Sequence, residues 1–207
     1  MNATTIIFVR HGETLWNQEG RYQGQMDSPL SKLGLDQAER VGEWLSKRRI
    51  DAVYTSDLKR AERTAECIAK HHKLKPTIDP RLREMAFGVW EGLTRQEVRA
   101  QYAQLWAERH QDRLQTRIPQ GELPAEVVER LRSFLSDCTA REEKQTIVVV
   151  SHGGALRLIL ASLLGIPLEN SSCLSQSNTG VSELVFRKGS KSCPWEVLCL
   201  NSTSHLA

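Results

Sequence analysis

The feature that most constrains the fold is a continuous run of β-branched residues, 146–150, that is followed directly by a Ser-His-Gly-Gly motif at residues 151–154. A strand without polar alternation is typical of a sheet that is covered on both faces. The apolar residues that come next predict a helix over residues 155–164. A buried strand that leads through glycines into a helix favours an α/β layer fold.

A second strand of the same kind begins the chain. Residues 4–9 are β-branched and aromatic, and they end at Arg10-His11-Gly12. Further elements are expected as helices over residues 31–47 and 57–70 and as strands over residues 52–55, 181–186 and 195–200. Alternating strands and helices predict a three-layer α/β fold, with a mostly parallel central sheet flanked by helices, in a single domain over residues 1–207. The polar, arginine-rich residues 85–121 are expected to form a helical insertion that covers the active site.

Composition excludes several classes of protein. The 28 Lys and Arg residues and 25 Asp and Glu residues leave a formal net charge of +3 in 207 residues, which is too weak to indicate binding to nucleic acid or to an acidic membrane surface. No apolar run approaches the ~20 residues of a membrane span, and residues 1–5 do not resemble a signal peptide. Five scattered cysteines without a C-x-x-C pair favour reduced thiols, so we expect a cytoplasmic protein.

The motifs of several enzyme classes are missing from the chain. It has no G-x-x-x-x-G-K-[ST], no G-x-G-x-x-G, no G-x-S-x-G and no H-E-x-x-H. The sequence therefore gives no support to a P-loop NTPase, a dinucleotide-dependent dehydrogenase, a serine esterase or a zinc protease.

The two histidines that follow strands are the candidate chemical groups. Ligands of α/β sheets bind beyond the carboxyl ends of the strands, where His11 and His152 would face each other if their strands are neighbours. A neutral imidazole held by a hydrogen bond is a competent nucleophile, and the adjacent Arg10 can bind a phosphate. The helix that begins after His152 favours an anion at its N-terminus. For either histidine alone, a simple loop or helix-capping role is a serious alternative.

Four blocks of the sequence resemble the histidine phosphatase superfamily, which is also called phosphoglycerate-mutase-like. They are Phe8-Val9-Arg10-His11-Gly12-Glu13-Thr14, which contains the RHG motif; Ser56-Asp57-Leu58-Lys59-Arg60-Ala61; Leu82-Arg83-Glu84 with Gly88 and Trp90-Glu91-Gly92; and Ser151-His152-Gly153-Gly154. The blocks occur in the order of the family and span nearly the whole chain. The resemblance is to its phosphatase branch, which includes broad-specificity and α-ribazole phosphatases.

The resemblance implies a role for each matching residue. His11 would become phosphohistidine, Arg10, Arg60 and His152 would surround the phosphoryl group, and Glu84 would be the general acid. The same pocket would be lined by Asn17, Gln23, Gly24 and Gly153. Two arginines and two histidines supply enough positive charge that no metal and no cofactor are expected. Asp57 is expected to cap the helix that carries Arg60.

The function expected from these residues is hydrolysis of a phosphomonoester of a small metabolite. A cofactor-dependent phosphoglycerate mutase is an alternative, although the Arg-Arg pair typical of such mutases is absent between Met85 and Gly121. A narrow α-ribazole phosphatase and a non-catalytic phosphate-binding module are further alternatives. Many relatives have Gly-Glu-Ser where this chain has Gly121-Glu122-Leu123. A homodimer is a candidate assembly.

The arginines of the insertion allow two interpretations. They are Arg95, Arg99, Arg109, Arg113 and Arg117. As a set they are typical of a solvated helix face. The alternative is that one of them binds a carboxylate or a second phosphate of the substrate.

Overall fold

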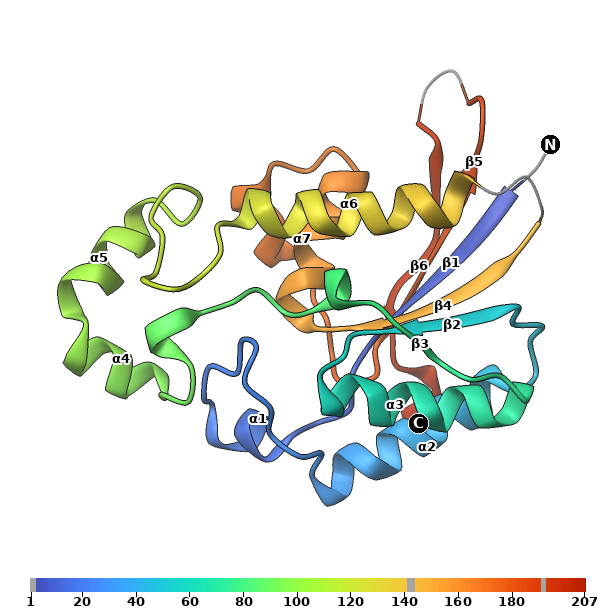
Figure 1. Ribbon diagram of the computed structural model, residues 1–207, viewed down its shortest axis with the longest axis horizontal. Helices are drawn as coiled ribbons and strands as arrows, with labels where there is room; N and C mark the ends of the chain where they lie inside the picture. Colours follow the sequence, from blue (N-terminus) through green and yellow to red (C-terminus); the bar gives the residue numbers. More distant parts are fainter. Residues whose placement is uncertain (1–2, 141–143, 191–192) are drawn as a thin grey trace.

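Across residues 3–140, 144–190 and 193–207, which the computed structural model describes, the strands form one six-stranded sheet in the order β3-β2-β4-β1-β5-β6 (Figure 1). The strands are β1 (Ala3–Arg10), β2 (Ala52–Thr55), β3 (Thr77–Ile78), β4 (Thr146–Ser151), β5 (Val181–Arg187) and β6 (Trp195–Ser202). β1 to β4 run parallel to one another, whereas β5 pairs antiparallel with β1 and with β6. The predicted α/β fold with a mostly parallel sheet is confirmed.

Helices cover both faces of this sheet (Figure 1). Helices α2 (Lys32–Leu45) and α3 (Lys59–Ala69) pack on the face formed by residues such as Ile7, Val9, Val148 and Val150. Helices α6 (Pro124–Ala140) and α7 (Gly153–Leu163) pack on the other face, which includes Ile6, Phe8, Ile147 and Val149. Alternate residues of β1 and β4 thus enter opposite cores. This explains the unbroken apolar runs, since each fully buried Val or Ile contributes roughly 1.5–3 kcal/mol.

Helix α6 was not anticipated from the sequence, although its signal is visible. Its buried apolar residues are Val127, Val128, Leu131, Phe134, Leu135 and Cys138, which recur at the spacing of an amphipathic helix. They fill the core between α7 and the sheet. Of the polar residues between them, all but Arg130 are exposed, so the helix follows the ordinary pattern of a sheet-covering layer.

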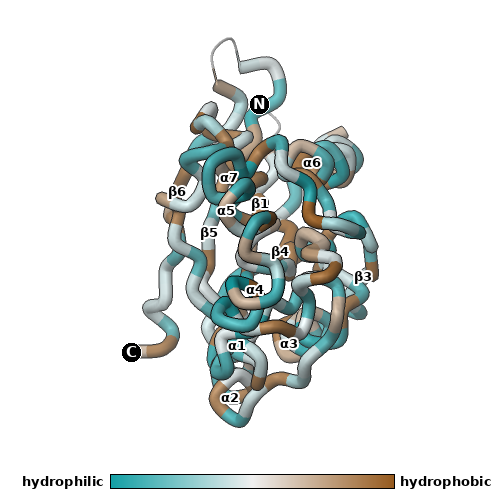
Figure 2. The backbone as a smooth tube through the Cα atoms, turned by 90° about the vertical axis from the view of Figure 1, so that its left-hand side faces the viewer, coloured by the Kyte–Doolittle hydropathy of each residue, from teal (hydrophilic) through white to brown (hydrophobic). Residues whose placement is uncertain are grey.

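The segment expected to be a helical insertion does contain helices. These are α4 (Arg95–Gln101) and α5 (Ala103–Gln111), and they pack on a small separate core formed by Trp90, Val98 and Ile118. In Figure 1 they lie to the left of the sheet, and in Figure 2 they face the viewer. The remaining helical elements are α1 (Leu15–Glu19) and short 3-10 turns at Lys70–His72, Pro80–Leu82, Gly88–Trp90, Leu168–Cys173 and Ser204–Leu206. Among the described residues, none of the helices has both the length and the apolar character that a membrane crossing needs.

The start of α2 rests directly on the loop that follows β1. A methyl group on Gly34 would lie 1.9 Å from the Glu13 carbonyl oxygen, and one on Gly12 would lie 2.4 Å from the Gly34 carbonyl oxygen. Both neighbours are backbone atoms, so neither can move without displacing its segment. Two glycines therefore allow α2 to hold the loop that carries His11.

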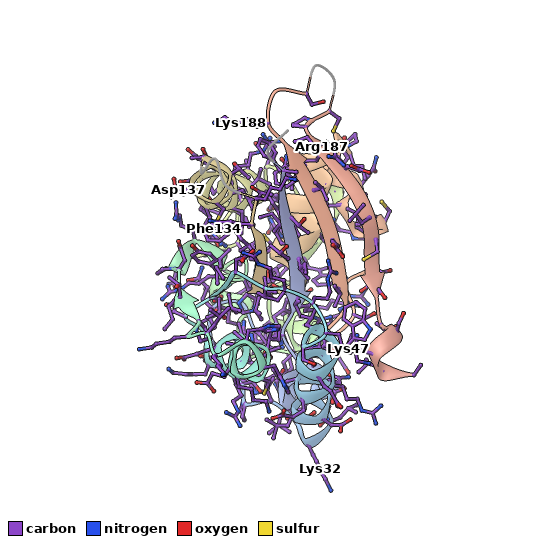
Figure 3. All side chains as sticks on the ribbon, turned by 90° about the vertical axis from the view of Figure 1, so that its right-hand side faces the viewer. Lys32, Lys47, Phe134, Asp137, Arg187 and Lys188 are labelled. Atoms are coloured by element: carbon purple, nitrogen blue, oxygen red, sulfur yellow. The ribbon has the colours of Figure 1, made fainter. Side chains whose placement is uncertain are left out.

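We predict that Gly34→Ala destabilises the protein by about 1–3 kcal/mol, the usual cost of overpacking. Helix propensity alone predicts the opposite sign, because Ala is favoured over Gly in a helix by about 1 kcal/mol. Urea unfolding of the variant and the parent protein measures the difference. Lys32→Ala is the control: its side chain lies on the same helix and points away from the molecule (Figure 3), so a change within about 0.5 kcal/mol is expected. A more stable Gly34→Ala protein would contradict the backbone contact.

Candidate active site

Two buried histidines lie side by side at the carboxyl ends of β1 and β4. The two strands are parallel neighbours, and Arg10 is the register partner of Ser151. The residues that follow, His11 and His152, are 3% and 0% exposed, and their ring centroids are 5.1 Å apart. The predicted juxtaposition of the two histidines is therefore present.

The His11 ring is oriented by its own backbone and by the adjacent loops. Its Nδ1 lies 2.7 Å from the Gly12 carbonyl oxygen, which can only accept a hydrogen bond, so the proton is on Nδ1. Nε2 therefore carries the free lone pair. Thr64 Oγ1 accepts from the Gly12 amide at 3.1 Å, and Asn178 Nδ2 donates to the His11 carbonyl at 3.0 Å. These bonds fix the ring by fixing the backbone on which it stands.

Both imidazoles are kept neutral. Burial lowers the pKa of His11 well below its usual value, and the charges of Arg60 and Arg10 lower it further. Burial, with Arg60 as the next cause, also lowers the pKa of His152 well below its usual value. A neutral ring has one N–H and one lone pair, so His11 can act as a nucleophile without first losing a proton.

Arg10 and Arg60 bring buried positive charge to the histidines. Arg10 Nη1 donates to the Gln176 carbonyl at 2.7 Å, and burial lowers the Arg10 pKa to about 10. Arg60 is 1% exposed; its Nη2 donates to the Gly24 carbonyl at 2.7 Å and its Nη1 to the Met26 carbonyl at 2.7 Å. Nη1 also donates to Asp27 Oδ1 at 3.0 Å, so Nε and the second hydrogen of Nη2 are the donors left for a ligand.

Several nitrogen atoms at this place are buried but have no hydrogen-bond partner within the described part of the chain. They are Nε of Arg10, Nε of Arg60, and both ring nitrogens of His152. Buried polar groups are normally bonded, so a set of this kind calls for an occupant. Gly153 keeps the space open, because a methyl group there would lie 3.2 Å from Arg10 Nε. An anion with several acceptor oxygens would satisfy the two arginine nitrogens and the one His152 nitrogen that carries the proton of the neutral ring.

Glu84 lies at the N-terminus of α7, beside His152. Its Oε2 accepts from the Gly154 amide at 2.9 Å, and its Oε1 accepts from the amides of Ala155 and Met85, both at 2.8 Å. A methyl group on Gly154 would lie 2.7 Å from Oε1, so this close approach requires glycine. Because Oε2 accepts only one of these bonds, it has the freer lone pair for a proton.

The loop that binds Arg60 is itself held by a carboxylate. Glu91 Oε1 accepts from the amides of Phe87 and Gln25 at 2.8 and 3.1 Å, and Oε2 accepts from Met26 at 3.2 Å. Gly24 adopts φ = 53°, and any side chain on it would collide with Glu91. The predicted residue Gly24 therefore lies at the site through its backbone.

The other predicted pocket residues have mixed surroundings. The Gln23 side chain is buried, and its Oε1 has no partner among the described residues. Asn17 closes a capping box with Thr14 at the start of α1, and its Oδ1 also accepts from Asn178 Nδ2 at 3.3 Å. Its side-chain oxygen is therefore occupied by protein groups.

Residues that sequence reasoning missed come from the segment between α7 and β5. Gln176 bonds Arg10 through its carbonyl, and Asn178 links His11 with Asn17. No motif marks these two positions, and Gln176 acts through its backbone carbonyl.

The expectation for Asp57 was wrong: α3 has Leu58 at its N-cap and no side-chain cap, whereas Asp57 accepts from Arg83 Nε at 2.8 Å. That carboxylate joins two blocks 26 residues apart in the sequence.

The unusual Leu123 lies before α6. Its amide donates to Glu126 Oε2 at 2.8 Å, so the cap of this helix start comes from a glutamate. The preceding Glu122 accepts from the Ala86 amide at 2.9 Å and forms an ion pair with Arg130. Arg130 in turn donates to the Glu84 carbonyl at 3.0 Å. This segment therefore supports the backbone that carries Glu84 without a hydroxyl group at position 123.

Within the described ranges, no three His, Cys, Asp or Glu side chains gather as metal ligands would.

Comparisons with known proteins agree with this geometry. Residues 6–201 match the model of the histidine phosphatase superfamily, branch 1. A probable phosphoglycerate mutase GpmB of Erwinia tasmaniensis is 36% identical over 203 residues, which cover 97% of this chain and 94% of the relative.

Two solved structures have the same fold over nearly their full length. Bacillus stearothermophilus YhfR superposes with a TM-score of 0.89 at 31% identity, covering 99% of this chain and 100% of that chain. A mycobacterial glucosyl-3-phosphoglycerate phosphatase solved with VO3 superposes with a TM-score of 0.85 at 30% identity, covering 96% of this chain and 99% of that chain. With its family blocks gathered around two adjoining histidines, the chain belongs to the histidine phosphatase superfamily.

Proposed function

We propose that the protein hydrolyses phosphomonoesters of small metabolites through a phosphohistidine at His11. The observation that supports this most is the set of buried nitrogens without partners on Arg10, Arg60 and His152, grouped around a neutral imidazole. A transferring phosphoryl group carries its charge on three equatorial oxygens, which need such donors. The superfamily membership and the phosphatase among the structural relatives support the same reaction.

The proposed reaction has two steps. In the first, the His11 Nε2 lone pair attacks phosphorus, the P–O ester bond breaks, and Glu84 gives a proton to the leaving oxygen. In the second, water attacks phosphorus and loses a proton to Glu84, and the N–P electron pair returns to Nε2. Arg10, Arg60 and His152 stabilise the phosphoryl oxygens in both steps, so the proposal needs no metal. The five scattered cysteines favour the cytoplasm as its location.

Mutase activity is the second candidate, because curated relatives such as the Erwinia protein carry the name of a probable phosphoglycerate mutase. The lack of an Arg-Arg pair between Met85 and Gly121 favours the hydrolase. The two activities differ in their products. Release of inorganic phosphate from a phosphomonoester supports hydrolysis, whereas conversion of 3-phosphoglycerate into 2-phosphoglycerate without phosphate release supports the mutase. A protein that does neither would be a binding module.

The first test concerns the nucleophile. His11→Asn removes the attacking nitrogen, so we expect activity to fall below detection and acid-labile labelling by a radioactive phosphomonoester to disappear. The control is His71→Asn, an exposed histidine outside the site, which is expected to keep both properties. Labelling that persists in His11→Asn would show that another residue carries the phosphoryl group.

The second test concerns the acid. Glu84→Gln removes the transferable proton, so formation of phospho-His11 is expected to slow by ~10²–10⁴-fold with an alkyl phosphate, the range for general acid catalysis. With p-nitrophenyl phosphate, whose leaving group needs no proton near neutral pH, the same step should change far less. General damage to the site would slow phosphorylation of His11 by both substrates alike. The ratio of the two slowing factors therefore isolates the contribution of proton transfer. Equal slowing in rapid-quench kinetics would refute the assignment.

The third test uses the depressed pKa values of His11 and His152. Below pH 6.5 the unfolded chain binds protons that these folded histidines do not, so the free energy of unfolding falls as pH falls. Each such histidine contributes a slope of up to about 1.4 kcal/mol per pH unit. His72 and His205 also have lowered pKa values, so His152→Asn is compared with the parent protein to isolate one residue. Denaturant unfolding between pH 7 and 5.5 should show a shallower slope in the variant; identical slopes would mean that the fold does not lower the pKa of His152.

A further inference from the structure

A cavity of about 230 Å³ adjoins Glu84. Its wall includes Met85 and Gly154, whose amides donate to the two oxygens of the Glu84 carboxylate. In the proposed reaction Glu84 protonates the leaving oxygen, so the cavity begins where the leaving group would lie. Its volume is below the range of ~300–1,000 Å³ typical of drug-sized ligands, which fits a small metabolite.

Three arginines line this cavity: Arg109 from α5, Arg113 just after α5, and Arg157 from α7. Within the described ranges, none of them forms an ion pair with a carboxylate. Asp112, the acidic residue next to Arg113 in sequence, accepts from the backbone amides of Leu114 and Gln115. The cavity therefore carries positive charge that this part of the chain does not neutralise.

The rest of the lining makes this charge more effective. It includes the aromatic side chains Tyr22, Phe87, Trp90 and Trp106. Apolar walls exclude water and strengthen the attraction between an arginine and an anion. The arginines also repel one another: burial first, then Arg113, lowers the Arg109 pKa, and burial first, then Arg157, lowers the Arg113 pKa. An anion between them would relieve both the repulsion and the desolvation.

The three arginines are not equally available. Arg109 is 8% exposed, donates to the Thr116 carbonyl through Nη1, and contacts Met85 Sδ through Nη2 at 3.9 Å. Arg113 gives one Nη2 bond to Ser171 Oγ at 3.2 Å, and Arg157 has a buried Nε without a partner among the described residues. Arg109 thus holds the wall, while Arg113 and Arg157 have donors for a ligand.

We propose that this cavity binds a second anionic group, a carboxylate or a phosphate on the leaving group of the substrate, through Arg113 and Arg157. This inference rests on the proposed function for the position of the phosphoryl group. It selects, among phosphomonoesters, those of anionic alcohols. The proposal applies the alternative interpretation of the insertion arginines to Arg113, whereas Arg117 forms an ion pair with Glu126.

The test measures binding, so that it does not depend on turnover. Isothermal titration calorimetry on His11→Asn compares 3-phosphoglycerate with glycerol 3-phosphate, which has CH2OH in place of the carboxylate. The third ligand is propane-1,3-diol bisphosphate, which tests a second phosphate as the second anionic group. We expect one or both of the doubly anionic ligands to bind about tenfold or more tightly than glycerol 3-phosphate, as charge-assisted bonds imply. Equal affinity for all three would overturn the proposal.

Arginine variants in the same His11→Asn background identify the groups responsible. Arg113→Gln and Arg157→Gln should each remove most of the preference for the doubly anionic ligand while changing the affinity for glycerol 3-phosphate little. Arg117→Gln is the matched control from the same segment, and it should retain the preference. Loss of affinity for all ligands alike in the Arg113 and Arg157 variants would refute a specific second-anion site.

The failure of this inference can be told apart from failure of the proposed function. Phosphate release by the parent protein from p-nitrophenyl phosphate tests the hydrolase alone. A protein that releases phosphate but binds the three ligands equally refutes only the second-anion site. A protein that prefers the doubly anionic ligands through Arg113 and Arg157 but releases no phosphate refutes only the hydrolase.

Discussion

The site depends on the parallel pairing of β1 with β4, with Arg10 opposite Ser151. A strand advances roughly 3.3 Å per residue, and its side chains change face at each residue. A slip of one position would therefore turn one histidine toward the opposite face, and a slip of two would displace it by more than the 5.1 Å that now separates the rings. The helices packed on both faces hold this register, so the chemistry depends directly on the two cores.

Buried charge then determines the state of the histidines. Arg10 and Arg60 oppose protonation of His11, and the same two arginines are the groups that a phosphoryl group would neutralise. In the proposed reaction, the neutral state of the His11 nucleophile and the positive charge of the phosphoryl site are thus consequences of one arrangement. The charge of Glu84 acts on both arginines and opposes the burial that lowers their pKa values. The backbone amides of α7 bind the Glu84 carboxylate at the helix N-terminus.

The sequence allows the layers of the fold and the meeting of His11 with His152 to be predicted, because buried strands and the glycines after them are local signals. Glu84 could be placed only through the family resemblance, since a single carboxylate carries no pattern. Gln176 and Asn178 could not be found, because they act on residues more than 160 positions away and one uses its backbone. Asp57 was misassigned for the same reason: its partner Arg83 is distant in sequence, whereas a capping role is visible locally.

In the proposed reaction, different parts of the structure bind the phosphoryl group and the leaving group. The phosphoryl side combines Arg10, His11 and His152 at the ends of β1 and β4 with the buried Arg60 of α3. The leaving-group side combines Arg157, one helical turn after Gly154 on α7, with Arg113 and the aromatic residues of the insertion. Since α4 and α5 pack on their own small core, their side chains can change without altering the β1–β4 register. In the proposed second-anion site, Arg157 is the fixed part and Arg113 the variable part, so substitutions around Arg113 are expected to change which alcohol is accepted while the phosphoryl group is bound as before.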